Sequence, residues 1–230
     1  MRMQPPARTG VKEIAKELLA LFPQLDDVGR RIALALYRQL AEGAPVPLGA
    51  LAARLQISSD AVGEQMRAWP GVYYDGHRRV IGFQGLTIAP MAHRLRVEGR
   101  ELYAWCAWDT LFLPELVGAT MHVESTCRAT GHAIHLSVTP QALESAAPPE
   151  TVISFLIPQS AEIKKDVITS FCHYVHFFSA TQAARGWLAQ RPDAFLLGVT
   201  DAYKLGRRIN EARYGDRLRD LRAREAPSTR

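Results

Sequence analysis

The sequence predicts an α+β protein in two parts, a winged-helix-like helical domain at residues 1–85 and a catalytic α+β domain at residues 86–230. Three observations support this prediction. Apolar residues recur at helical spacing up to Trp69, a hairpin signal follows, and beyond Pro90 short alternating segments indicate strands. The sheet of the second part is therefore expected to be mixed and mainly antiparallel, with flanking helices.

The first part carries clear signals for helix ends. Pro23 and Pro70 each follow an apolar run of helical period, and Ser58 stands where a helix begins. Asp75-Gly76 lies between two apolar runs and is a strong signal for a hairpin turn. Helices followed by a hairpin predict a winged helix, with its segments at residues 11–22, 26–43, 47–55, 58–69 and 72–81.

The second part alternates strand and helix signals. Glu98-Gly99 and the stretch from Arg128 to Gly131 are expected to turn the chain between neighbouring strands. Strands are expected at residues 93–97, 100–105, 121–127, 132–139, 152–157 and 172–178, and helices at residues 106–116, 181–190 and 202–222.

A winged helix raises the question of DNA binding, and the charges argue against it. The helix that would read DNA offers Asp60 and Glu64 against the single base Arg67, and two acids repel phosphates. The chain has a net charge of +5, but residues 201–230 hold nine Lys/Arg and five Asp/Glu and so carry most of it. We interpret that segment as a basic, solvated helix rather than a nucleic-acid site.

Composition indicates a globular protein of the cytoplasm. The 230 residues are 47% hydrophobic, and no stretch approaches the roughly 20 apolar residues of a membrane span. The N-terminus lacks the apolar core of a secretory signal, so we expect cytoplasmic residence and no membrane partner. Three cysteines are an odd number without paired spacing, which predicts free thiols and argues against structural zinc.

Cys106 and Asp109 form the first candidate constellation. If the run from Tyr103 to Val117 is helical, their spacing of three puts both side chains on one face. A helix start would lower the pKa of the Cys106 thiol, and an apolar setting would raise the pKa of the Asp109 carboxyl toward neutrality. The alternatives are a small buried hydrophobe at Cys106 and a solvated surface acid at Asp109.

The other two cysteines lie at strand signals. Cys172 begins an apolar segment in which alternation places Cys172 and His176 on one face and His173 on the other. That prediction disfavours a zinc pair of His173 and His176, because the rings would point apart. For Cys127 we expect a buried packing role rather than a metal ligand.

Three segments together resemble the organomercurial (alkylmercury) lyases of bacterial mercury resistance. They are Tyr103–Leu111 (YAWCAWDTL), Cys127–Gly131 (CRATG) and Ser170–Phe178 (SFCHYVHFF). Their order, spacing and flanking aromatic residues agree, and the resemblance extends over residues 10 to 215. It implies cleavage of a carbon–mercury bond to give a hydrocarbon and Hg(II).

The resemblance also implies roles for single residues. Cys106 and Cys172 match the family's mercury-binding cysteines, Asp109 its catalytic acid and Cys127 its mainly structural cysteine. Trp105 is expected to line the substrate pocket. Mercury would be substrate and product rather than a cofactor, and no resident cofactor is expected. External small thiols or a mercuric reductase would accept the Hg(II), and we expect a monomer.

Two other functions compete with this interpretation. The first is a mercury- or thiol-responsive winged-helix regulator, against which the acidic helix counts. The second is a general thiol enzyme in which Cys106 attacks carbon and His176 acts as base. It requires His176 within hydrogen-bonding reach of Cys106 and leaves Cys172 without a function.

Overall fold

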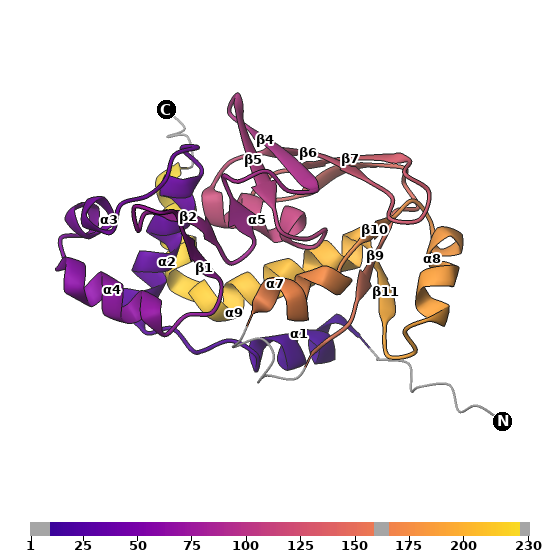
Figure 1. The fold of residues 1–230 in the computed structure, drawn as a ribbon, viewed down its shortest axis with the longest axis horizontal. Helices are drawn as coiled ribbons and strands as arrows, with labels where there is room; N and C mark the ends of the chain where they lie inside the picture. The colour runs from indigo at the N-terminus through magenta and orange to yellow at the C-terminus, as the bar shows by residue number, and fades with distance from the viewer. Residues whose placement is uncertain (1–9, 159–165, 226–230) are drawn as a thin grey trace.

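The N-terminal helices and hairpin form as the sequence predicts. The structure is a computed structural model that describes residues 10–158 and 166–225 (Figure 1). Side chains cap two of the helices: Asp26 accepts from the Gly29 N–H at 2.7 Å, and Ser58 accepts from the Ala61 N–H at 3.2 Å. The elements are α1 (Val11–Leu19), α2 (Asp27–Leu40), α3 (Leu48–Leu55), α4 (Ser59–Arg67), β1 (Val72–Tyr74) and β2 (Val80–Phe83).

The rest of the chain alternates strands and helices. Most of the predicted segments appear within a few residues of their expected bounds, and β3, β8 and β11 were not predicted. In order, the elements are β3 (Leu86–Thr87), β4 (His93–Val97), β5 (Arg100–Ala104), α5 (Asp109–Val117), β6 (Met121–Thr126), β7 (Ala133–Val138), β8 (Leu143–Ala147), β9 (Val152–Phe155), α7 (Val167–Ser170), the short 3-10 helix η1 (Cys172–Tyr174), β10 (Phe177–Phe178), α8 (Thr181–Ala189), β11 (Phe195–Gly198) and α9 (Val199–Glu225).

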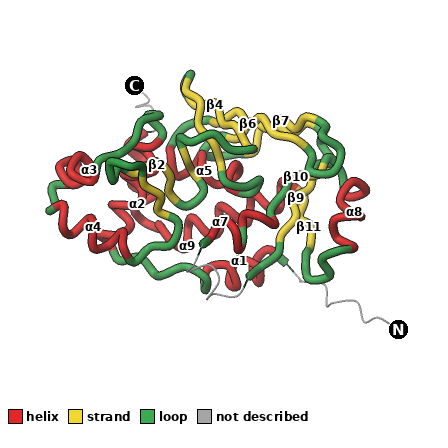
Figure 2. The backbone as a smooth tube through the Cα atoms, viewed as in Figure 1, coloured by secondary structure: helices red, strands yellow, loops and turns green. Residues whose placement is uncertain are grey.

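Two antiparallel sheets carry the strands (Figure 2). The larger runs in the order β1-β2-β3-β5-β4-β6-β7-β8, and the smaller is β10-β9-β11. In β4 the buried side chains of Leu95 and Val97 alternate with the exposed Arg94 and Arg96, which is the pattern of a sheet with one face on the core. The prediction of an α+β fold with a mainly antiparallel sheet is confirmed.

The long helix α9 packs against helices α1, α2 and α5 and against both sheets. It crosses the molecule beside α1 and α5 and contacts both sheets (Figure 1). The buried Glu115 of α5 pairs with Arg207 at 3.0 Å and accepts from Asn210 at 2.8 Å, and Gly206 allows the close approach to Phe112. The helix kinks at Gly215, whose φ of 43° and ψ of −120° lie outside the helical region.

The surface helices are amphipathic rather than uniformly apolar. Within the described ranges, no helix combines the length and the apolar character that a bilayer span requires.

The segment from Cys172 to Phe178 differs from its prediction. It begins as η1, and only Phe177 and Phe178 pair with β9 as a strand. The Val175 N–H donates back to the Cys172 carbonyl at 3.1 Å, which closes a tight turn. The prediction of a strand from residue 172 was wrong because α7, capped by Asp166, ends directly before Cys172 and its turn continues through Tyr174.

Candidate active site

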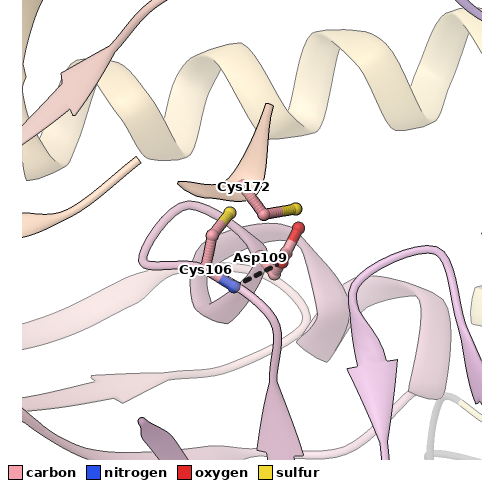
Figure 3. Close-up of side chains that lie close together, drawn as sticks. All are labelled: Cys106, Asp109 and Cys172. Atoms are coloured by element: carbon pink, nitrogen blue, oxygen red, sulfur yellow. Dashed lines mark hydrogen bonds between the residues drawn. The ribbon is translucent and has the colours of Figure 1, made fainter. Parts of the chain in front are cut away.

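Cys106, Asp109 and Cys172 converge in the interior of the protein (Figure 3). A sulfur or carboxylate oxygen from each lies within 4.8 Å of the others. Exposed fractions are 0% for Cys106, 5% for Asp109 and 6% for Cys172. Two soft sulfur donors and one proton-carrying group therefore share a single buried site.

A turn between β5 and α5 brings Cys106 and Asp109 together. The Cys106 N–H donates to the Asp109 carboxylate at 2.8 Å, and the Thr110 hydroxyl donates to the Ala107 carbonyl at 2.7 Å. The helix begins at Asp109 and not at Cys106 as the sequence predicted. The two side chains meet all the same, because the carboxylate folds back over the turn that precedes its helix.

Gly85 makes room for that carboxylate. Its φ is +105°, and a Cβ built there would lie 2.7 Å from the Asp109 carboxyl carbon. The Gly85 carbonyl also accepts the Trp105 N–H at 3.0 Å, which fixes the residue before Cys106. Gly85 is a positioning residue that the patterns in the sequence did not identify.

Cys172 reaches the site through α7 and η1. Asp166 caps α7 by accepting the Ile168 N–H at 2.9 Å, and its carboxylate also accepts the Tyr73 hydroxyl at 3.0 Å. The Ala107 N–H donates to the Val175 carbonyl at 3.3 Å and so joins the Cys106 turn to the Cys172 segment. The hairpin and the Cys106 turn thus hold Cys172 from two sides.

We expect Tyr73→Phe to lower the free energy of unfolding by about 1 kcal/mol, because it deletes the hydrogen bond to the cap of α7. Urea denaturation of the purified variant measures the change. Tyr74→Phe is the matched control, because Tyr74 is 42% exposed. Equal stability of the two variants would show that the Tyr73 hydrogen bond contributes nothing.

Both thiols of the site have raised pKa values. Burial raises the pKa of Cys106 well above that of an ordinary thiol, and its hydrogen bond with Cys172 and the charge of Asp109 add to the rise. The same hydrogen bond lowers the pKa of Cys172, but burial and the carboxylates of Asp109 and Asp166 outweigh it. The prediction that a helix start favours the Cys106 thiolate was wrong, because Cys106 precedes the helix and is fully desolvated.

The carboxyl of Asp109 has a pKa near neutrality. Burial raises it from 3.8 to about 7, against hydrogen bonds from the side chain and backbone of Cys106 that lower it. This is the direction that the apolar surroundings predict. A group with this pKa exchanges protons readily at the pH of a cell.

We expect Asp109→Asn to stabilise the fold near pH 8 and to have little effect near pH 4. A raised native pKa favours the protonated native state, so its contribution is complete below pH 3.8 and is lost as the pH rises to about 7. At about 1.4 kcal/mol per pKa unit, the upper bound of the gain is about 4 kcal/mol. Chemical denaturation of both proteins at the two pH values measures it. A gain that does not depend on pH would contradict the desolvation of this carboxyl.

A cavity of about 50 Å³, partly open to solvent, adjoins Asp109 and Cys172. Its walls are mostly apolar and come from α1, α2, α5, α7 and α9 as well as the turns at residues 84–85 and 105–109. The lining residues are Leu18, Phe22, Tyr37, Gln84, Gly85, Trp105, Trp108, Asp109, Phe112, Leu116, Val167, Phe171, Cys172, Ile209, Asn210, Arg213 and Tyr214.

Trp105 and Trp108 line this cavity from the two sides of Cys106. The ring of Trp105 packs edge-on against Tyr73 with centroids 5.1 Å apart. The Trp108 indole N–H donates to the Ala202 carbonyl at 2.9 Å, which ties the turn to α9. The structure therefore places Trp105 at the cavity, where the sequence expected it to line a pocket.

Cys127 lies apart from the cluster. It is 2% exposed, and the Ser179 hydroxyl lies 3.6 Å from its sulfur. Burial raises the pKa of Cys127, but hydrogen bonds involving Thr130 and Ser179 outweigh this and lower it to about 7. Its backbone closes the β6–β7 turn through the Gly131 N–H at 2.9 Å, an arrangement that fits the expected packing role.

His173 and His176 occupy one cleft, contrary to the prediction that they point apart. Their ring centroids are 6.4 Å apart, because η1 replaces the expected strand and removes its alternation. Arg128 and Arg191 line the same cleft, and the His176 ring packs edge-on against Trp187 at 5.8 Å. Burial, Arg128 and His173 lower the pKa of His176 to about 4.

This location removes the support for a general thiol enzyme. The Cys106 side chain has Asp109 and Cys172 as its partners, while His176 belongs to the separate cleft against Trp187. That alternative also needs Cys172 to be idle, yet its sulfur lies in the same cluster as that of Cys106.

Known proteins resemble this chain over most of its length. The alkylmercury lyase family model matches residues 86–211. The alkylmercury lyase of Staphylococcus epidermidis is 39% identical over 205 residues, 89% of this chain and 93% of that protein. The alkylmercury lyase of Streptomyces lividans is 40% identical over 177 residues, 77% of this chain and 80% of that protein.

A solved structure shows the same fold. The crystal structure of the mercury-bound form of MerB2 superposes with a TM-score of 0.72 at 23% identity, covering 89% of this chain and 99% of that chain. These relatives give no support to the alternative of a mercury- or thiol-responsive regulator. By its match to the family model and by its identity to curated members, this chain belongs to the alkylmercury lyase family.

Proposed function

We propose that this protein is an alkylmercury lyase that cleaves carbon–mercury bonds by protonolysis. The observation that carries the proposal is the buried cluster of Cys106, Asp109 and Cys172 beside an apolar cavity. Mercury is a soft metal that prefers thiolate sulfur to nitrogen and oxygen ligands. Two sulfurs this close would select R–Hg⁺ over the harder cations of a cell.

The first step is ligand exchange on mercury. One thiol of the pair displaces the external ligand of R–Hg–SR′, forms a sulfur–mercury bond and releases R′SH. Because burial keeps the thiols protonated, this exchange needs a nearby proton acceptor or the departing thiolate itself. The apolar walls of the cavity receive the organic group R.

The second step breaks the carbon–mercury bond. The remaining thiol passes its proton to the Asp109 carboxylate and binds mercury, and the added electron density makes the carbon basic. Asp109 then delivers that proton to the carbon, which keeps the electron pair of the broken bond. The products are R–H and Hg(II) held by Cys106 and Cys172, and Asp109 returns to its carboxylate form.

Release of Hg(II) needs competing thiols. We propose that small cytosolic thiols or the cysteines of a mercuric reductase take the metal, since only soft sulfur ligands compete with a dithiolate. The cleavage step transfers one proton to carbon, and neither step oxidises or reduces any atom. The proposed reaction therefore uses no resident cofactor. Mercury is substrate and product.

The N-terminal part is proposed to act as a cover of the site rather than as a DNA reader. A winged-helix-like arrangement of its helices and hairpin is part of this proposal, and the bridge of Val46 to Val80 beside the hairpin supports it. Leu18, Phe22 and Tyr37 from this part line the cavity. The division at residue 85, cytoplasmic residence and a monomeric state stay predictions of the sequence.

The test is hydrocarbon release from a defined substrate. Reduced protein is incubated with phenylmercury and excess neutral thiol, and benzene is measured by gas chromatography alongside bound and free Hg(II). Benzene and Hg(II) are expected in equal amounts over many turnovers. Tight binding of phenylmercury without any benzene would overturn the lyase and indicate a carrier or sensor.

A further inference from the structure

A half-buried guanidinium lies at the cavity wall, on the kinked helix α9. Arg213 lines the cavity, and its Nε and Nη2 atoms are buried without a hydrogen-bond partner. The guanidinium packs over the rings of Phe22 and Tyr214, with centroids at 5.1 and 5.5 Å. Among the residues that the structure describes, no carboxylate forms an ion pair with it.

A second polar group, the hydroxyl of Tyr214, lies next to it. The Tyr214 residue is 1% exposed and lines the same cavity, and its hydroxyl shares a hydrogen bond with the Tyr37 side chain. Buried N–H donors without an acceptor cost free energy, and they cost more on a charged group such as the Arg213 guanidinium. Stacking on aromatic rings offsets part of that cost but satisfies none of the N–H donors.

The cavity thus has two chemically different regions. One is lined by Asp109 and Cys172 of the mercury-binding cluster, and the other by Arg213 and Tyr214. Tyr37 adjoins both regions of the cavity. Burial, Tyr214 and Asp109 raise the pKa of the Tyr37 hydroxyl, and the charge of Arg213 lowers it. The walls between them are apolar.

We propose that Arg213 and Tyr214 form a subsite for a carboxylate carried by the mercurial substrate. The fork of guanidinium N–H groups matches the two oxygens of a carboxylate, and the Tyr214 hydroxyl supplies a further donor. The apolar walls would hold the hydrocarbon part between this subsite and the mercury atom. The inference rests on the proposed lyase function and names its substrate class: mercurials that carry an anionic group.

The carboxylate has two possible sources. It belongs either to the organic group, as in 4-carboxyphenylmercury, or to the thiol ligand on mercury, as in a mercaptoacetate adduct. The experiment therefore compares 4-carboxyphenylmercury with phenylmercury, each in excess 2-mercaptoethanol and again in excess mercaptoacetate. Benzoate and benzene are quantified by chromatography, and kcat/KM is obtained for each combination.

Arg213→Met is expected to lower the preference for the carboxylate substrate over phenylmercury at least about tenfold, because it removes a charged hydrogen-bonding pair. Arg213→Lys should keep part of the preference, since it retains the charge but not the fork. Arg208→Met is the matched control on the same helix, because Arg208 is exposed, and it should leave the preference unchanged. If the carboxylate belongs to the thiol, the Arg213→Met defect will follow mercaptoacetate and not the organic group.

An equal loss for all substrate and thiol combinations in Arg213→Met would overturn the subsite and leave Arg213 a packing role. Tyr214→Phe gives a second test if Arg213→Met fails to fold, and an unchanged preference there would remove Tyr214 from the subsite. Relative affinities of the two mercurials are measured in parallel by competition with neutral thiol. If no hydrocarbon appears with any substrate, the lyase proposal fails, and these affinities still decide the subsite.

Discussion

Replacing either Cys106 or Cys172 by serine is expected to lower the turnover of phenylmercury by about 10³-fold or more. Serine keeps nearly the shape of cysteine, but its hydroxyl is a hard ligand that does not hold mercury. With one sulfur left, the electron density that the second thiolate gives to the carbon is missing. The two sulfurs lie in one cluster and not in separate sites, so neither is expected to replace the other.

Benzene release under excess neutral thiol measures this effect, with circular dichroism to verify folding. Cys127→Ser is the matched control, because Cys127 is equally buried but lies outside the cluster. That control is expected to remain active wherever it folds. A Cys172→Ser enzyme with wild-type turnover would refute a mechanism that uses two thiols.

Asp109→Ala is expected to bind mercury nearly as well as the wild type and to protonate carbon about 10²- to 10⁴-fold more slowly. Binding depends mainly on the two sulfurs, while the proton must pass through the carboxyl between thiol and carbon. A single-turnover experiment separates the two events by following bound mercury and released benzene in one reaction. Asp201→Ala is the control, since that carboxylate is exposed on α9.

The pH dependence gives an independent view of the same residue. The carboxylate form accepts the thiol proton, and its pKa is about 7. We therefore expect kcat/KM to fall about tenfold per pH unit below pH 7 in the wild type. The Asp109→Ala enzyme should lack this dependence. An identical pH profile in both proteins, or an unaltered single-turnover rate, would remove Asp109 from proton transfer.

Local patterns in the sequence were sufficient for most of the fold. Helix period and capping residues predicted α1 to α4, and Asp75-Gly76 predicted the hairpin that follows. The proximity of Cys106 and Asp109 also depends on short-range geometry and could be predicted from their spacing. Cys172 joined them only through the family resemblance, because nothing local places it 63 residues further along the chain beside Asp109.

The features that the sequence failed to predict all depend on contacts between distant segments. Gly85 is needed because Asp109 lies against it, and no turn rule contains that contact. His173 and His176 share a cleft because a cap at Asp166 sets the path of the chain before them. Arg213 looked like one more charge on a basic helix, and only the tertiary structure buries its donors in the cavity.

The burial of the two thiols also bears on oxidative damage. Peroxides attack thiolates that solvent can reach and convert them to sulfenic acids. Cys106 is 0% and Cys172 6% exposed, and burial raises the pKa of both thiols, so peroxide meets little of the reactive thiolate form. Mercury exchanges into such thiols with a proton acceptor beside them. In the proposed mechanism, the two thiols therefore resist oxidation between turnovers and still react with the mercury of a substrate.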